Sequence, residues 1–303
     1  MTTAGAPADG GGSRRAPLTC ATSGAVVTGA GRGLGRLIAR LLVERGHLVL
    51  VTDLDESAAA ATADELGPRA VPRVLDVRDA AAVEAARDDI VARAGRLAVW
   101  VNNAGVLATG PAWQQDADTR RLMLEVNALG TINGTVAAID GMRGRGGGHV
   151  VNIVSLAGIT AVPGEAVYAA SKHAAIGFSL STLADLRLAG VSDVDISCIC
   201  PDGIWTPMLH DRLDDAASAL SFSGRLLQPE EVVRVIADVL DRPRPVITVP
   251  RWRGLQARVA DALPRLGVRA APLAVALGRR AQRRMRAAGW DRGSAGAGTT
   301  QEW

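Results

Sequence analysis

The chain has one tyrosine and one lysine, and they lie four residues apart in the segment YAASK, as Tyr168 and Lys172. Residues at this spacing share a helix face, one turn apart. A phenol has a pKa of roughly 10 and is a poor base at neutral pH, but a neighbouring ammonium lowers that pKa. The pair is therefore a candidate acid–base site for moving a proton to or from an alcohol oxygen. The alternative is a surface pair left by compositional chance.

The elements that must position this pair are visible as an alternation of two patterns. Seven apolar runs, expected to be strands, alternate with segments of helical periodicity between residues 22 and 250. Such alternation is typical of parallel βαβ units. We predict an α/β fold, a Rossmann-type doubly wound parallel sheet of about seven strands, that forms one catalytic domain over residues 22–250. The segment YAASK then lies on a helix expected over residues 165–188.

A glycine-rich turn, TGAGRGLG at residues 28–35, separates the first strand from its helix. Gly29 suits a tight turn, Gly33 lets the backbone approach a pyrophosphate, and Gly35 lets the helix pack closely on the strand. The helix N-terminus after Leu34 offers free N–H groups and a positive dipole end to phosphates. This context predicts a dinucleotide site, and the alternative is a glycine-rich loop without a ligand.

Asp53 ends the second predicted strand, 18 residues after Gly35. Its carboxylate can accept hydrogen bonds from the adenosine ribose and would repel the 2′-phosphate of NADP. Arg32 in the glycine turn favours NADP, unless a neighbouring acid pairs with it. We give Asp53 the greater weight because it would lie at the ribose itself. The sequence therefore predicts NAD as the cofactor, with NADP as the alternative.

Several separated motifs over residues 22–250 resemble those of the short-chain dehydrogenase/reductase family. TGAGRGLG matches the family pattern TGxxxGxG, NNAG at residues 102–105 matches the motif after strand four, and YAASK matches YxxxK. Ser155 precedes Tyr168 by 13 residues, which is the usual family spacing, and Asn127 matches the family's helix asparagine. Asp76 matches the acid that binds the adenine ring. The resemblance implies an NAD(P)-dependent oxidoreductase that works as a homodimer or homotetramer.

The resemblance also implies a role for each site residue. Tyr168 would be the general acid/base, Ser155 would donate to the substrate oxygen, and Lys172 would bind the nicotinamide ribose and tune Tyr168. Asn127 would hold a relay water. Ser155 could instead be a strand-end cap, and Asn127 an interior residue bonded to backbone. The implied cofactor-binding residues are Gly29, Arg32, Gly33, Leu34, Gly35, Asp53, Leu54, Asp76, Val77, Asn103, Ala104, Gly105, Tyr168, Lys172, Pro201, Ile204 and Thr206.

One loop departs from the family pattern. Pro201 and Thr206 match the loop after strand six, but Asp202 stands at the usual glycine position and Gly203 follows it. The loop is therefore expected to turn differently. An acid near the carboxamide could also influence substrate choice.

Apolar side chains follow Thr206, where the family keeps its substrate lid. A pocket so lined prefers a lipophilic secondary alcohol or ketone. For any single residue the alternative is helix packing. The rival functions are an NADP-dependent ketone reductase and a non-catalytic NAD-binding scaffold or sensor; the complete catalytic set argues against the second. Ile204, Leu209, Leu220 and Phe222 belong to the apolar set, and the substrate-contact candidates are Ser155, Trp113, Trp205 and Met208.

Residues 251–290 are predicted to form a basic amphipathic helical extension. Residues 251–292 hold eleven arginines against two aspartates, a net charge of +9 in a chain of net +3. Its apolar residues fall on two helical faces. The pattern suits an interfacial helix on anionic lipid, or a helix packed on its own domain or on a second subunit. Nucleic acid binding is disfavoured because no recognition motif is present. The two faces are Leu255, Val259, Leu263 and Leu273, Leu277, Ala281, Met285.

The remaining features point to an intracellular setting. The three cysteines, Cys20, Cys198 and Cys200, lack zinc or redox spacing, which indicates a reducing compartment and no metal. No secretory leader is apparent, and no apolar run approaches the roughly 18 residues of a spanning helix. We predict a cytoplasmic protein, with peripheral membrane contact left open. Residues 1–21 and 291–303 are predicted to be disordered tails. Cys198 and Cys200 are expected in the core, and His173 is expected to be structural.

Overall fold

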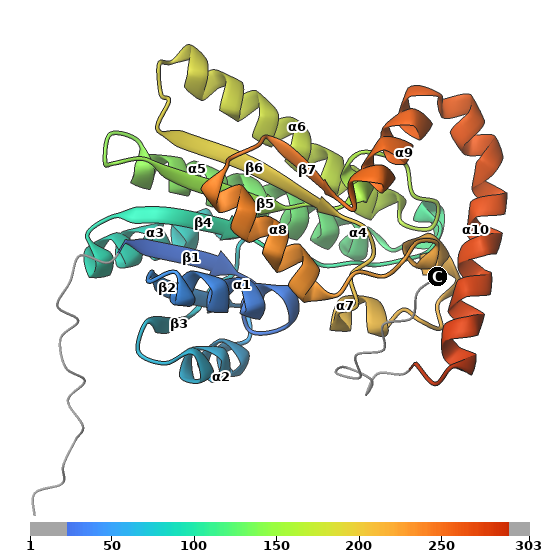
Figure 1. Cartoon of the computed structure of the whole chain (residues 1–303), viewed down its shortest axis with the longest axis horizontal. Helices are drawn as coiled ribbons and strands as arrows, with labels where there is room; N and C mark the ends of the chain where they lie inside the picture. Colours follow the sequence, from blue (N-terminus) through green and yellow to red (C-terminus); the bar gives the residue numbers. More distant parts are fainter. Residues whose placement is uncertain (1–22, 291–303) are drawn as a thin grey trace, which may run out of the picture.

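The computed structural model describes residues 23–290, so both predicted tails and Cys20 lie outside the described residues. Its centre is a seven-stranded parallel sheet in the order β3-β2-β1-β4-β5-β6-β7 (Figure 1). This order confirms the predicted Rossmann-type fold. The strands are β1 (Gly24–Thr28), β2 (Leu48–Asp53), β3 (Ala70–Val74), β4 (Leu97–Asn102), β5 (Gly148–Ile153), β6 (Val194–Pro201) and β7 (Val246–Val249).

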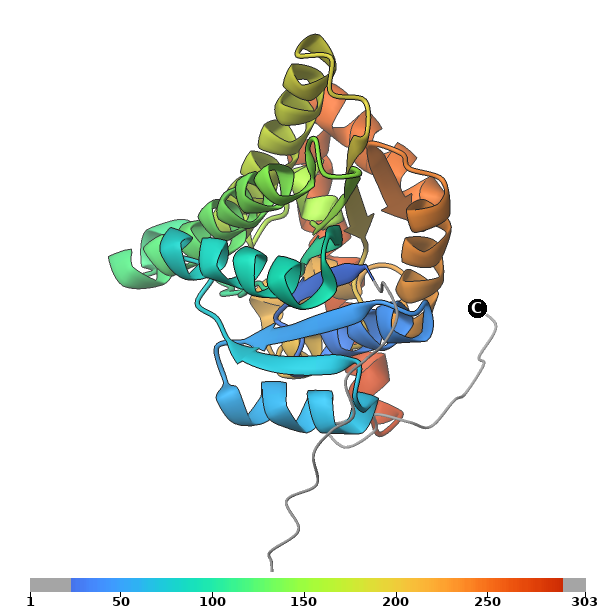
Figure 2. The same cartoon turned by 90° about the vertical axis from the view of Figure 1, so that its left-hand side faces the viewer.

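Helices cover both faces of the sheet (Figure 2). One face carries α1 (Gly33–Glu44), α2 (Glu56–Leu66) and α8 (Pro229–Asp241), and the other carries α3 (Ala80–Ala94), α5 (Gly130–Met142) and α6 (Ala166–Leu188). Strands buried on both sides read as continuous apolar runs, which is why they are visible in the sequence. Two core clusters result, one under α1 and α8 and one around Trp100 under α3 and α5.

A long helix carries Asn127 through a widened turn. The helix runs as α4 (Ala117–Leu124), a π-helical turn η2 (Glu125–Leu129) and α5. Single π turns inside helices are frequent at functional sites. By length and composition alone, Ala117–Met142 is the one helix in residues 23–290 that could cross a membrane, which the sequence patterning did not anticipate. More than half of its most apolar window is buried inside the fold, as expected of a core helix.

The C-terminal extension is a helical hairpin of α9 (Arg251–Ala262) and α10 (Pro264–Ala287). In Figure 1, α10 stands at the end of the molecule toward which the strands point. It packs on a short helix, η4 (Ala216–Phe222), through small residues. A Cβ on Gly278 would lie 2.0 Å from the Ala219 carbonyl oxygen, and Gln282 Nε2 donates to Asp215 O at 2.8 Å.

The packing face of this hairpin is not either of the apolar faces expected from the sequence. Leu255 and Leu273 are 66% and 67% exposed, although Met285 does join the cluster at Trp205. The extension therefore packs on its own domain through small residues and Gln282, together with Met285 and Trp290 at the Trp205 cluster. Most of its leucines and valines face outward.

Candidate active site

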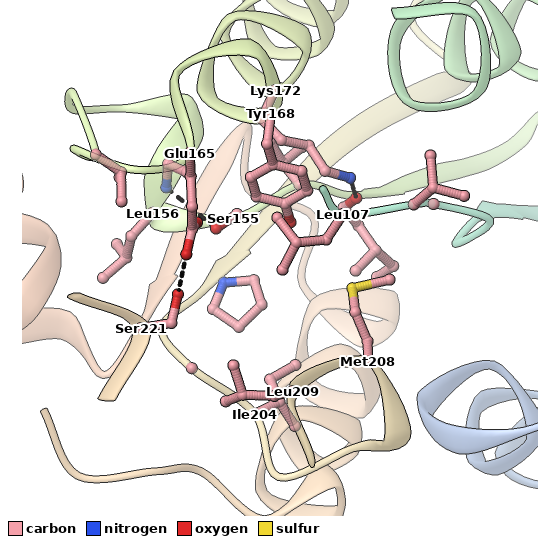
Figure 3. Close-up of a pocket in the computed structure, with 18 of the residues that line it drawn as sticks. Leu107, Ser155, Leu156, Glu165, Tyr168, Lys172, Ile204, Met208, Leu209 and Ser221 are labelled. Carbon is pink, nitrogen blue, oxygen red and sulfur yellow. Dashed lines mark hydrogen bonds between the residues drawn. The ribbon is translucent and has the colours of Figure 1, made fainter. Parts of the chain in front are cut away.

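A cavity of about 1180 Å³ lies at the carboxyl ends of the strands. Ligands bind at this edge in open α/β sheets because the loops after the strands converge there. The cavity is continuous from the glycine turn, past the ends of β4 and β5, to the lid after β6 and the α9–α10 hairpin. Ser155, Tyr168 and Lys172 all line it, and Figure 3 shows them together at its wall.

The glycine turn fits a phosphate-bearing cofactor. Gly29 and Gly33 have left-handed φ values of +60° and +56°, and a Cβ on Gly33 would meet only Pro207 Cδ, at 3.8 Å. Helices α2, α3 and α4 are each capped by an aspartate side chain, whereas α1 has no side-chain cap and no acid in its first turn. The N–H groups at the start of α1 are therefore free to bind phosphate oxygens.

Gly35 has the packing role predicted for it. A Cβ there would lie 2.2 Å from Gly29 O and 2.5 Å from Asn103 Nδ2, so no larger residue fits. Asn103 holds the turn in place by donating from Nδ2 to Thr28 O and Gly29 O, both at 2.9 Å. The first strand, the glycine turn and the loop after β4 are thus one rigid unit beside the cavity.

Asp53 lies at the cavity with its carboxylate oriented by backbone. Oδ2 accepts from Gly31 N at 2.9 Å and Oδ1 from Asp55 N at 3.1 Å. Arg32 also lines the cavity, and it lies close enough to Asp55 to help lower the pKa of that carboxyl, which hydrogen bonds from Ser57 lower most. Asp55 is thus an acid near Arg32, and pairing of Arg32 with an acid stays a prediction. Leu54 lines the same region.

Asp76 and Val77 line the cavity beyond Asp53. The Asp76 carboxylate forms an ion pair with Arg78, whose Nη2 lies 2.6 Å from Oδ2, and this hydrogen bonding lowers the pKa of Asp76. Arg78 lines the cavity as well and was not identified from the sequence. Its signal was weak because it is one of many arginines. Ala104 and Gly105 complete this side.

Asn127 is fully buried behind the cavity wall and does not line it. Its Oδ1 accepts from Val106 N at 2.8 Å, and its Nδ2 donates to Val106 O at 2.9 Å and to Ser171 Oγ at 3.1 Å. These bonds tie the loop after β4 to helix α6. The side-chain amide therefore joins these two segments. A relay water near Asn127 would have to bind to neighbouring groups, because the amide is already hydrogen-bonded.

Ser155, Tyr168 and Lys172 form the reactive part of the wall. Ser155 Oγ accepts from Ala157 N at 3.1 Å and lies close enough to Tyr168 to affect the pKa of the phenol. Lys172 Nζ lies 5.6 Å from the centre of the Tyr168 ring. Lys172 Nζ donates to Ile153 O at 3.1 Å, and burial lowers the pKa of Lys172 to about 8.

The expectation that Lys172 lowers the pKa of Tyr168 does not hold in this structure. Burial raises the pKa of the phenol, the charge of Glu165 raises it further, and the hydrogen bond with Ser155 lowers it in part. The ammonium is directed to the Ile153 carbonyl and the ring face instead. Tyr168 is therefore held as a neutral phenol at neutral pH.

The loop after β6 explains the unusual Asp202. Its side chain is 10% exposed and pairs with Arg253 of α9, with Nε and Oδ2 2.6 Å apart. Arg253 Nη2 also donates to Ser223 Oγ at 3.2 Å. The carboxylate is thus paired with the C-terminal extension. Pro201, Ile204 and Thr206 all line the cavity.

Two of the predicted substrate contacts lie elsewhere. Trp113, in η1 (Ala112–Gln114), is 84% exposed and does not line the cavity. Trp205 is buried in a separate cluster with Leu209, Phe222 and Trp290, where it stacks edge-on against Trp290 at 4.7 Å. Apolar character alone did not distinguish packing from lining. Met208, on α7 (Pro207–His210), does line the cavity, with Leu209 and Leu220.

Glu165 is a cavity residue that the sequence reasoning missed. It immediately precedes α6, is 3% exposed, and its Oε1 accepts from Ser221 Oγ at 2.6 Å. Burial raises its pKa to about 7. The available signal was its position three residues before Tyr168, which places both on one side of the helix.

Three residues outside the cavity are structural. Cys198 and Cys200 are buried free thiols in a small core cluster with Val154 and Ala175, as predicted. His173 Nδ1 lies 2.8 Å from Ala169 O on its own helix and does not line the cavity.

The chain is similar to proteins that are named as oxidoreductases. The family model described as short chain dehydrogenase matches residues 23–217. The chain is 33% identical to the oxidoreductase SadH of Mycobacterium tuberculosis over 252 residues, which is 80% of this chain and 90% of the relative. It is 32% identical to the 3-oxoacyl-(acyl-carrier-protein) reductase FabG of Vibrio harveyi over 215 residues, which is 70% of this chain and 87% of that one.

A solved structure shares the fold. It is a short chain dehydrogenase/reductase from Burkholderia phymatum in complex with NAD, with a TM-score of 0.73 and 28% identity. The alignment covers 81% of this chain and 95% of that one. The chain described here belongs to the short-chain dehydrogenase/reductase family and is an oxidoreductase that acts on alcohol or ketone groups with a nicotinamide cofactor.

Proposed function

We propose that this protein transfers a hydride between NAD and a lipophilic secondary alcohol or ketone. The observation that carries the proposal is a single cavity with three successive parts. It runs from the uncapped start of α1 and Asp53, past Ser155 and Tyr168, to apolar side chains of the lid. A cofactor at the first part and a substrate at the last would meet beside Tyr168.

The catalytic roles follow from the geometry of the wall. The nicotinamide cofactor, when bound, supplies or accepts the hydride. Tyr168, neutral at neutral pH, is the proton donor to the substrate oxygen when a ketone is reduced. Ser155 Oγ donates to the same oxygen and stabilises its developing charge. Lys172 is a buried ammonium beside the phenol ring, a position from which it can bind the nicotinamide ribose.

Asp53 supports NAD rather than NADP in this proposal. Its carboxylate is fixed by Gly31 and Asp55, and its remaining lone pairs can accept from ribose hydroxyls. A 2′-phosphate at this place would be repelled. The NADP-dependent alternative rests on Arg32, which has Asp55 as a neighbour.

The test is a panel of lipophilic secondary alcohols and ketones, followed by nicotinamide absorbance with each cofactor. We expect turnover with NAD(H) for at least one member, and loss of that turnover in Tyr168→Phe with cofactor binding retained. Cofactor binding without turnover of any member, in both directions, would favour the scaffold or sensor alternative.

We also propose that the protein is cytoplasmic and that it contacts an anionic membrane through α9 and α10. Large apolar side chains on these helices are exposed in the single chain, and arginines surround them. Interfacial helices combine an apolar row with basic residues in this way. The exposed residues are Trp252, Leu255, Val259, Leu263, Leu266, Val268, Leu273 and Leu277.

Co-sedimentation with phosphatidylserine vesicles tests this contact. We expect binding that weakens with salt and is reduced several-fold in a Leu273→Ser/Leu277→Ser variant. Leu188→Ser is the matched control, because Leu188 is 87% exposed on α6, away from the hairpin. If the wild type ignores the vesicles at low salt and light scattering shows an oligomer that the hairpin variant disrupts, a second copy covers this face instead.

An exposed apolar surface on another part of the molecule supports the proposed homodimer or homotetramer. Leu129, Val136 and Leu180 are partly exposed on the neighbouring helical segments η2, α5 and α6. An apolar surface of this kind favours contact between copies. Light scattering of the whole chain is the direct measurement.

A further inference from the structure

Glu165 is a buried carboxyl at the substrate end of the cavity, and the reaction described above does not use it. It is 3% exposed yet lines the cavity. Within residues 23–290, Ser221 is the side chain that donates to it, through one hydrogen bond to Oε1. An ionised carboxylate has about four lone-pair sites, and a protonated carboxyl keeps part of that capacity, so acceptor capacity remains free in either state.

Both charged and apolar side chains surround this carboxyl. Arg212, Asp215 and Asp202 are close enough for their charges to act on it. The apolar side chains of Met208 and Leu209 line the cavity across from Glu165 in Figure 3. A ligand that covers Glu165 without donating to it leaves a buried acceptor unsatisfied, which is unfavourable by about 1–3 kcal/mol. A ligand that carries a hydrogen-bond donor at this point avoids that penalty. The site therefore favours ligands that carry a hydrogen-bond donor near Glu165 over ligands that lack one.

The position of Glu165 fixes where on the substrate the donor lies. Glu165 and Tyr168 are three residues apart at the start of one helix, and both face the cavity beside Ser155 (Figure 3). Side chains at this spacing are neighbours, with Cβ atoms about 5–6 Å apart. Because Tyr168 and Ser155 bind the reacting oxygen in the proposed function, the donor lies on the part of the substrate next to the reacting carbon.

We propose that Glu165 is a specificity-determining residue that accepts a hydrogen bond from a substrate hydroxyl. The preferred substrates are then lipophilic α- or β-hydroxy ketones, or the corresponding diols. This inference rests on the proposed function, whose substrate class it narrows.

A structural latch is the competing role for Glu165. Ser221 belongs to η4, and a Cβ on Gly164 would lie 2.0 Å from Ala217 O, so the lid and the start of α6 are in close contact. The Glu165–Ser221 bond joins these two segments. A latch would affect all substrates alike, whereas a hydroxyl acceptor changes the ratio between substrates.

The experiment compares a linear methyl ketone with its α-hydroxy and β-hydroxy derivatives of the same chain length. The readout is the ratio of kcat/KM for the hydroxy ketone to kcat/KM for the plain ketone, with NADH. Glu165→Met keeps the side-chain length and removes the acceptor. Ser221→Ala removes the lid bond and keeps the carboxyl. Asp214→Asn is the matched control, since Asp214 lies in the same lid region, pairs with Arg286 at the surface and does not line the cavity.

We expect the wild type to favour one hydroxy ketone by tenfold or more. A site that hydrogen-bonds a substrate hydroxyl strongly disfavours the analogue that lacks it. Glu165→Met should lower this ratio by about tenfold or more, so that the preference is removed. Ser221→Ala and Asp214→Asn should retain it. An unchanged ratio in Glu165→Met, or an equal loss on all ketones in Glu165→Met and Ser221→Ala, would overturn the proposal and favour the latch.

Binding separates failure of this inference from failure of the proposed function. Thermal shift in the presence of NADH measures each ketone's affinity without turnover. If no ketone is reduced but Glu165→Met selectively loses the shift from the hydroxy ketone, the inference stands and the proposed reaction fails for these compounds. If plain and hydroxy ketones shift the wild type equally, Glu165 does not recognise a hydroxyl.

Discussion

The two ends of the cavity are built by different means. At the cofactor end, backbone geometry makes the site: left-handed glycines, an uncapped helix and an aspartate fixed by two N–H groups. At the substrate end, side-chain pairs from distant segments make it, such as Asp202 with Arg253 and Glu165 with Ser221. Backbone-built sites need specific residues at fixed spacing, so they suit a cofactor shared by many enzymes. Side-chain pairs can differ between relatives, which suits substrate choice.

The largest expected effect lies where the two ends meet. Lys172→Arg keeps the charge but places a planar, bulkier group in a buried position beside Tyr168. We expect kcat to fall by two or more orders of magnitude, about 2.7 kcal/mol of transition-state stabilisation, with folding little changed. Tyr168→Phe should lose at least as much. Turnover of Lys172→Arg near that of the wild type would show that the lone lysine is a compositional leftover.

The second prediction concerns Glu165, at the substrate end of the cavity. The pKa of Glu165 is about 7 in the folded protein against an ordinary value of 4.5, so the unfolded chain loses this proton first as pH rises. Stability therefore falls between these values and is constant above them. Arg212 opposes the raised pKa, and Asp215 and Asp202 add to it. Glu165→Gln does not titrate and should gain stability over the wild type, by ~2 kcal/mol at neutral pH or above.

Urea unfolding of both proteins at about pH 5 and about pH 8 measures this difference. Other carboxyls titrate in both proteins, so the difference between them isolates Glu165. A stability difference that does not grow with pH would show that Glu165 is ionised like an ordinary surface carboxylate.

A smaller effect is expected where the extension meets the cofactor loop. Arg253→Ala leaves the Asp202 carboxylate without its partner in a mostly buried place. We expect a loss of roughly 1–2 kcal/mol in the free energy of unfolding. We also expect a higher KM for the cofactor, because Asp202 and its neighbours Pro201 and Ile204 line the cavity. Arg269→Ala, an exposed change on α10, is the control. If the two variants had equal effects, the Arg253–Asp202 pair would not be what couples the extension to the loop after β6.

The difference between the two ends of the cavity also determines which features the sequence could predict. The sheet, the glycine turn, Asp53 and the Ser155–Tyr168–Lys172 arrangement follow from local motifs and from apolar runs that alternate with helices. Trp113 and Trp205 were misplaced because apolarity does not distinguish a cavity wall from a core. The pairing of Asp202 with Arg253 joins residues 51 positions apart, and only the packing of α9 brings them together. Glu165 was missed because its burial depends on the lid.

The central claim is that Asp53 and the glycine turn present NAD to Tyr168, and the ratio of kcat/KM for NAD to that for NADP tests it most directly. We predict that the wild type prefers NAD. In Asp53→Ala, kcat/KM for NAD should fall and that for NADP should rise, because the ribose acceptor and the repulsion of the 2′-phosphate are both removed. A wild type that prefers NADP, or an Asp53→Ala variant with an unchanged ratio, would contradict the account.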